Sequence, residues 1–159
     1  MPGISLAILP KLSGPGGVFN RGVAVTDAAM ADKSKRAARR FVVRNRTRGT
    51  VVANDVGIAD TPRARRIGLL RHAQLPPGEG LWIYPSQAIH TFWMRFSIDV
   101  AFLDRQRRVK RVYYRMPPFR LTRLLWDARS VFEVAAGVLA SSGTQTGDEL
   151  EFQPSEPQP

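Results

Sequence analysis

The sequence contains no cysteine and only two histidines, His72 and His90, among its 159 residues. The lack of cysteine excludes disulfide bonds, thiol catalysis and any zinc or iron–sulfur site with cysteine ligands. Two histidines are too few for a metal centre built from several imidazoles. We therefore predict no metal ion and no other cofactor.

Long apolar runs are also missing from the sequence. No stretch reaches the roughly 18 to 20 apolar residues that a membrane-spanning helix requires. The apolar run from Ile4 to Leu9 is short, is interrupted by Pro10, and follows no basic region, so it does not fit a secretory signal. We expect a cytoplasmic protein without a membrane span.

Acidic residues are scarce relative to basic ones. Thirteen Asp and Glu residues face 24 Lys and Arg residues, which gives a formal net charge of +11. Such a charge favours association with polyanions such as nucleic acid, acidic lipid or acidic glycan, but does not determine the fold. The densest basic cluster that we predict to bind polyanions contains Arg105, Arg107, Arg108, Lys110 and Arg111.

Two interpretations of this basic cluster remain open. Tyr113, Tyr114 and Phe119 follow it, and aromatic side chains among cations are typical of single-stranded nucleic-acid surfaces. The same composition is also typical of the solvent face of an ordinary strand. Because no motif for reading base edges is present, any nucleic-acid binding is expected to be weak and without sequence selectivity.

The ends of the sequence lack regular patterns. Residues 1–38 are rich in Gly and Pro and show neither helical nor strand periodicity, so we predict a flexible leader, with Met30 as an alternative start. Residues 153–159 contain three prolines and no apolar residue, which is typical of a disordered tail. A single domain is therefore expected over residues 39–152.

Most patterned segments of this domain predict strands, because they are short, rich in β-branched and aromatic residues, and separated by turn residues. The predicted strands cover residues 41–43, 50–58, 81–84, 89–94, 98–103, 109–116, 131–135 and 149–152. One helix is predicted at about 62–72, capped by Thr61, with Arg63, Arg65 and Arg66 facing mainly outward. A weaker helical turn is expected at 137–142. The predicted class is a mainly β sandwich or barrel with one short helix.

Several stretches together resemble one protein family. They are TPRARRIGLLR at 61–71, PGEGLWI at 77–83, IHTFWMRFSIDVAFLD at 89–104, VFEVAAG at 131–137 and GDEL at 147–150. Their order and spacing resemble the bacterial and archaeal family called domain of unknown function 192, or uncharacterised protein family 0127, over residues 41–152. Ser97 and Phe132 depart from the residues usual in that family. The resemblance implies a compact jelly-roll-like β domain and no established substrate.

One set of residues could support acid–base chemistry: His90, Asp99 and Glu133. In a hydrolase-like interpretation, His90 is a general base or proton shuttle and Asp99 orients it. The same three side chains could hold Mg²⁺ or Mn²⁺, although no local motif supports a metal. The structural interpretation instead pairs a buried Asp99 with Arg95 or with backbone amides. We favour the structural interpretation, because no nucleophile stands at a diagnostic spacing.

An aromatic-rich segment surrounds these residues. Trp82, Tyr84, Phe92, Trp93 and Phe96 could line a concave surface for a sugar or peptide, or could fill the core. We expect a non-enzymatic binding or accessory module for an unknown ligand, with residues 82–99 as its recognition surface. The predicted binding residues are Trp82, His90, Trp93, Arg95 and Asp99. The hydrolase-like enzyme and the polyanion binder remain as alternatives, and an open pocket at His90 would favour the enzyme.

Overall fold

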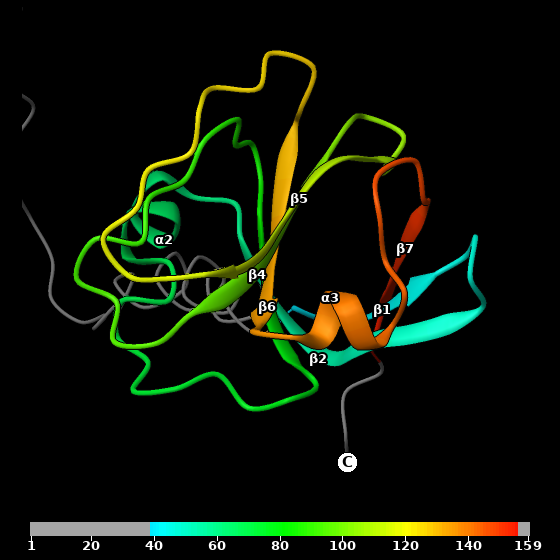
Figure 1. Ribbon diagram of the computed structural model, residues 1–159, viewed down its shortest axis with the longest axis horizontal. Helices are drawn as coiled ribbons and strands as arrows, with labels where there is room; N and C mark the ends of the chain where they lie inside the picture. The colour runs from blue at the N-terminus through cyan, green and yellow to red at the C-terminus, as the bar shows by residue number, and fades with distance from the viewer. Residues whose placement is uncertain (1–38, 156–159) are drawn as a thin grey trace, which may run out of the picture.

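The computed structural model describes residues 39–155 (Figure 1). The leader predicted over residues 1–38, with Met30 as an alternative start, and the last four residues of the predicted tail lie outside the described residues. The strands are β1 (Arg40–Asn45), β2 (Thr50–Ala59), β3 (Glu79–Ile83), β4 (Ile98–Leu103), β5 (Val109–Met116), β6 (Ser130–Ala135) and β7 (Leu150–Pro154). The helices are α2 (Pro62–Ile67) and α3 (Val138–Ser141).

The seven strands form one curled, mixed sheet in the order β5-β4-β6-β3-β2-β1-β7. Only β2 and β3 pair in parallel, and α2 lies in the crossover between them. The mainly β class predicted from the sequence is confirmed. The strands belong to one hydrogen-bonded sheet, however, and not to the two facing sheets of a jelly roll.

The sheet buries a different hydrophobic cluster on each face. On one face, Ala101 and Val134 pack in a cluster that includes Leu139 of α3. On the other face, Val100 and Val131 pack in a cluster that includes Leu69, just after α2. Because side chains alternate along a strand, successive residues of β4 and β6 serve opposite faces. Figure 1 shows the two helices at separate places around the curled sheet.

Helix α2 begins where its sequence predicts a cap, and it ends earlier than predicted, at Gly68. The Thr61 side chain accepts a hydrogen bond from the amide of Ala64 at 3.1 Å, and Pro62 occupies the first turn, where no amide partner is needed. Gly68 ends the helix with φ of +46°, and its amide donates to the carbonyl of Ala64 at 2.8 Å. The helix is therefore shorter than the predicted span of about 62–72. The weaker helical turn expected at 137–142 is confirmed as α3.

One strand and one boundary predicted from the sequence are wrong. Residues 89–94 form no strand: His90 makes one isolated bridge with Leu121, and the chain turns at Phe92 and Trp93, where φ of Trp93 is +68°. The buried Thr91 hydroxyl donates to the carbonyl of Pro117 at 2.7 Å, which holds this segment as a loop. At the other end, Gln153 pairs with Val42, so β7 extends into the predicted tail.

Within the described residues, no helix combines the length and the apolar character needed to cross a membrane.

Candidate functional site

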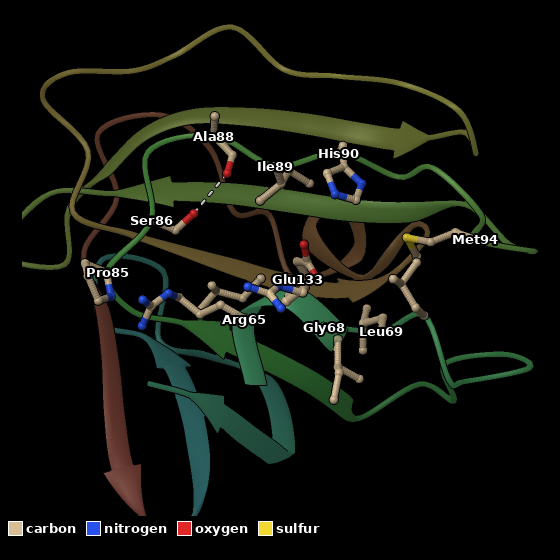
Figure 2. Close-up of a pocket in the computed structure, with 14 residues that line it drawn as sticks. Arg65, Gly68, Leu69, Pro85, Ser86, Ala88, Ile89, His90, Met94 and Glu133 are labelled. Atoms are coloured by element: carbon tan, nitrogen blue, oxygen red, sulfur yellow. Dashed lines mark hydrogen bonds between the residues drawn. The ribbon is translucent and has the colours of Figure 1, made fainter. Parts of the chain in front are cut away.

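A pocket of about 200 Å³ opens on the face of the sheet that α2 covers. Its walls are α2 with the turn that follows it, the loop from Pro85 to Met94, and the end of β3, and Glu133 of β6 contributes to its lining. Its main polar residues are Arg65, Arg66, Ser86, His90 and Glu133. Its main apolar residues are Leu69, Ile83, Ile89 and Met94. We call this cavity the α2 pocket (Figure 2).

Local hydrogen bonds hold the walls of the α2 pocket in place. The Arg65 guanidinium donates to the carbonyls of Asp60 at 3.0 Å and Tyr84 at 3.3 Å, so it ties α2 to the end of β3. The Ser86 hydroxyl donates to the carbonyl of Ala88 at 3.0 Å, which shapes the start of the loop. Arg65 is half-buried and Arg66, although exposed, also lines the pocket. The expectation that Arg63, Arg65 and Arg66 face mainly outward holds for Arg63 and Arg66, which are exposed, but not for the half-buried Arg65.

Glu133 is the most unusual group in the α2 pocket. Its side chain is carried by β6 and the residue is 4% exposed, and Figure 2 shows its carboxyl pointing into the space between His90 and α2. Leu81 and Val100 are its partners on the two neighbouring strands. No hydrogen bond or ion pair to this carboxyl occurs among residues 39–155. Burial raises the pKa of Glu133 from 4.5 to about 8, so the carboxyl is mostly protonated at neutral pH.

His90 opens onto the same pocket. Its residue is exposed, and its ring stacks on Phe92 with 5.2 Å between ring centroids and 21° between ring planes. The isolated bridge to Leu121 fixes the backbone of His90. His90 and Glu133 therefore line one cavity, from a loop and from a strand.

Asp99 lies on the opposite face of the sheet. It is fully buried beside α3 and accepts hydrogen bonds from the amides of Arg115 at 2.7 Å, Gly137 at 2.9 Å and Leu139 at 2.9 Å. The predicted pairing with backbone amides is confirmed, whereas Arg95 makes no bond to it. Since Asp99 pairs with Val134 in register, its side chain points away from the face that carries Glu133.

The predicted acid–base set is therefore divided by the sheet. His90 and Glu133 face the α2 pocket, and Asp99 is occupied by amides on the far side. Within the described part of the chain, no three His, Asp or Glu side chains come together as metal ligands.

The predicted aromatic surface is also divided. Trp82 packs in the core, stacked on Phe152 with 4.3 Å between centroids and edge-on to Phe41 at 5.5 Å. Trp93 is 75% exposed, and Arg95, two residues later, is exposed as well. Of the predicted binding residues, only His90 lines the α2 pocket, while Trp93 and Arg95 lie on the loop that borders it.

The basic cluster at 105–111 is exposed, but part of it covers aromatic groups. The Arg107 guanidinium lies 5.8 Å from the ring centre of Trp82, and that of Arg111 lies 5.3 Å from the ring centre of Tyr113. Lys110 forms an ion pair with Asp127 at 3.2 Å. These contacts give three members of the cluster structural partners, and Arg105 and Arg108 have none among the described side chains.

Sequence reasoning missed two groups of functional or structural weight. Arg66 received no role in a site, although it lies within the TPRARR motif that opens the helix.

The second group is Asp148 of the GDEL motif, which anchors a buried network. Its carboxylate accepts hydrogen bonds from the Asn45 side chain at 2.9 Å and from Arg48 at 3.2 Å. Burial favours a higher pKa for Asp148, but the bonds from Asn45, the Gln145 amide and Arg48, together with the Arg48 charge, lower it.

Comparisons with known proteins identify relatives of this chain. A protein of the UPF0127 family from Thermococcus sibiricus is 34% identical over 117 residues, which cover 69% of this chain and 73% of that protein. The crystal structure of a protein of unknown function from Novosphingobium aromaticivorans has a similar fold, with a TM-score of 0.63, 22% identity, and coverage of 71% of this chain and 84% of that one.

A second solved structure has the same fold. It is a putative transcription regulator from Sinorhizobium meliloti, with a TM-score of 0.59, 21% identity, and coverage of 72% of this chain and 92% of that one. Residues 43–152 match the family DUF192, described as Uncharacterized ACR. This chain therefore belongs to the DUF192 family, and the residues matched to it include both His90 and Glu133.

Proposed function

We propose that the chain is a small-molecule-binding module and that the α2 pocket is its binding site. The observation that carries the proposal is Glu133, a buried carboxyl that faces an open cavity and has no partner among the described residues. Within the described residues, Trp82 Nε1 is the buried side-chain atom without a hydrogen-bond partner, whereas the Glu133 carboxyl reaches the open cavity. A ligand in the α2 pocket would therefore meet a carboxyl that no described residue occupies.

The lining of the pocket favours a small organic anion. At neutral pH the protonated Glu133 offers one O–H donor and one carbonyl acceptor without a negative charge. Arg66 and Arg65 contribute positive charge at the same cavity, and Leu69, Ile89 and Met94 contribute apolar walls. A volume of about 200 Å³ is below that of pockets for drug-sized ligands, which begin at about 300 Å³. A carboxylate with a short apolar body fits both the charge and the size.

One observation favours an enzyme as the second candidate. A carboxyl with a pKa of about 8 can act as a general acid near neutral pH, and His90 shares its cavity. A hydrolase with a covalent intermediate also needs an activated nucleophile. Ser86 carries the only hydroxyl that lines the described pocket, and this hydroxyl donates to the carbonyl of Ala88 rather than to a base. Binding is therefore the function that the geometry supports better.

The test compares carboxylates with neutral amides of the same shape. Benzoate and acetate are titrated against the protein, with benzamide and acetamide as matched probes, and the melting temperature is recorded. We expect the carboxylates to raise the melting temperature, Arg66→Ala to abolish the effect, and Arg44→Ala, an exposed arginine of β1, to retain it. Equal responses to acids and amides, or an effect unchanged in Arg66→Ala, would contradict the proposal, as would the absence of any response.

A further inference from the structure

Two loops lie side by side next to the α2 pocket and form a second candidate surface. They cover residues 85–97 and 117–126, and we call their exposed side the loop surface. Four backbone hydrogen bonds join them: Thr91 N–H to the carbonyl of Arg120 at 2.8 Å, Phe119 N–H to that of Thr91 at 3.0 Å, Thr122 N–H to that of Ile89 at 3.0 Å, and Leu125 N–H to that of Gln87 at 2.9 Å. The loop surface is therefore a defined part of the fold.

Large apolar side chains gather on the loop surface. Six of the ten exposed large hydrophobic residues in the described chain belong to it: Phe92, Trp93, Phe119, Leu121, Leu124 and Trp126. Trp93 is 75% exposed, Leu121 68% and Phe119 55%. The rings of Trp93 and Phe119 pack edge-on with 5.9 Å between their centroids. An apolar group of this kind on a folded protein marks an interaction site.

The backbone holds two of these aromatic residues in a rare conformation. Trp93 has φ of +68° and Phe119 has φ of +59°, in the left-handed region that bulky residues seldom adopt. Strain of this kind persists where the surrounding structure enforces it, and it concentrates at functional sites. Both residues expose their aromatic rings, so the strained conformation does not serve to pack the hydrophobic core.

The charge on the loop surface is mainly positive. Arg95, Arg120 and Arg123 are exposed, residues 85–97 and 117–126 contain no aspartate or glutamate, and the neighbouring Asp127 pairs with Lys110 of β5 at 3.2 Å. None of these three arginines forms an ion pair with any residue between 39 and 155. The partner of the loop surface should therefore combine negative charge with room for apolar side chains.

We propose that the loop surface docks onto the headgroup region of an anionic lipid bilayer. Trp residues favour the membrane–water interface, and leucine and phenylalanine bury their side chains at the boundary of headgroups and acyl chains. Arginines near an anionic leaflet bind the lipid phosphates. Leu121 and Leu124 favour lipid over single-stranded nucleic acid, because aliphatic side chains do not stack on bases as aromatic rings do. The loop surface shares residues 85–94 with the wall of the α2 pocket, but none of the exposed apolar residues or arginines named for it lines that pocket, so the inference does not depend on the proposed ligand.

The test uses the full chain and vesicles of two compositions. Sedimentation with vesicles of phosphatidylcholine alone is compared with vesicles containing phosphatidylglycerol. We expect binding to the anionic vesicles only, with a blue shift of tryptophan emission, since Trp93 and Trp126 are exposed in the free protein. The double variant Trp93→Ser/Leu121→Ser should lose at least about tenfold in affinity.

Two further variants separate the contributions. Arg120→Gln/Arg123→Gln should weaken binding and reduce its dependence on salt. Val51→Ser, an exposed apolar residue on β2, serves as the matched control and should bind within about twofold of the parent chain. Because every changed side chain is exposed, each variant is expected to fold, and melting curves test this expectation.

Several results would overturn the proposal. They are equal binding to neutral and anionic vesicles, absence of binding to either, or unchanged affinity in the folded Trp93→Ser/Leu121→Ser variant. A thymidine oligonucleotide that binds more tightly than the vesicles, and that depends on Trp93 but not on Leu121, would assign the loop surface to single-stranded nucleic acid.

Discussion

Replacing Glu133 with glutamine should stabilise the protein at alkaline pH and leave its stability unchanged in acid. Glutamine has nearly the same shape as a protonated glutamate but cannot ionise, so Glu133→Gln isolates the cost of a buried charge. Burial raises the pKa of Glu133 from 4.5 to about 8 in the folded chain. Between these two values the folded state holds a proton that the unfolded state has released.

The magnitude follows from this difference. The native protein should lose about 1.4 kcal/mol of unfolding free energy per pH unit from pH 4.5 to about 8 through this group, and the variant should not. The stability difference is near zero at pH 4 and levels off at roughly 5 kcal/mol above pH 8, an upper value because water in the open pocket solvates the carboxylate. Such a difference is a large fraction of the stability of an ordinary domain.

Urea unfolding of both proteins at pH 4, 6, 7 and 8 measures the effect. Glu151→Gln, a half-exposed glutamate on the edge strand β7, is the control and should not reproduce the slope. If the difference between the native chain and Glu133→Gln stays constant across this range, the carboxyl is not buried without a partner. A native chain more stable than the variant at pH 8 would show that Glu133 is ionised and paired.

Three further predictions concern the fold and the basic cluster. Asp99→Ala removes the acceptor of three amides beside α3 and should lower the unfolding free energy by roughly 2 to 4 kcal/mol in urea titrations; a loss below about 0.5 kcal/mol would mean that other groups satisfy those amides. Gly80→Ala places a methyl group 2.9 Å from the carbonyl oxygen of Glu133 and should cost roughly 1 to 3 kcal/mol of unfolding free energy. Gly57→Ala is close only to the movable end of Arg40 at 3.1 Å, with Leu81 at an ordinary contact of 3.7 Å, and should cost less; equal melting temperatures would refute the steric argument. Replacing Arg105, Arg107 and Arg108 together with glutamine should lower the salt dependence of oligonucleotide binding by about two to three ions; an unchanged slope would show that they do not touch phosphate.

The strands could be predicted because they carry local signals. β4 reads IDVAFL and is buried along its whole length, and β6 reads SVFEVA between turn residues. The start of α2 was equally predictable, because Thr61 and Pro62 each have a preference for one helix position, whereas Gly68, which ends the helix, was placed inside the predicted span. Such signals depend on neighbours within a few residues, which the sequence displays directly.

The loop at 89–94 could not be predicted from the same signals. Its residues are apolar or β-branched at alternating positions, as in a strand, but its backbone bonds go to a segment some thirty residues later. The deciding contact, between the Thr91 hydroxyl and the carbonyl of Pro117, depends on that distant partner. Long-range contacts of this kind have no local pattern.

The candidate site was predictable only in part. His90 and Glu133 were selected by residue type, and the structure brings them to one cavity. Asp99 was assigned to the same set because the sequence alone does not show which face of the sheet its side chain occupies. A shift of one residue in register exchanges the two faces, so the strand pairing of β4 with β6 had to be known.

The curl of the sheet brings its two edge strands, β5 and β7, together at one end. At the start of these two strands, Arg108 forms an isolated bridge with Glu149. Val109 N–H donates to the carbonyl of Asp148 at 2.8 Å, and Leu150 N–H donates to that of Arg107 at 3.0 Å. An open seven-stranded sheet would present two rows of free peptide groups to other chains, and such rows nucleate aggregation. Here the peptide groups at one end of each edge strand are hydrogen-bonded within the molecule. The protein should therefore resist fibril formation through its β5 and β7 edges better than an open sheet of the same size.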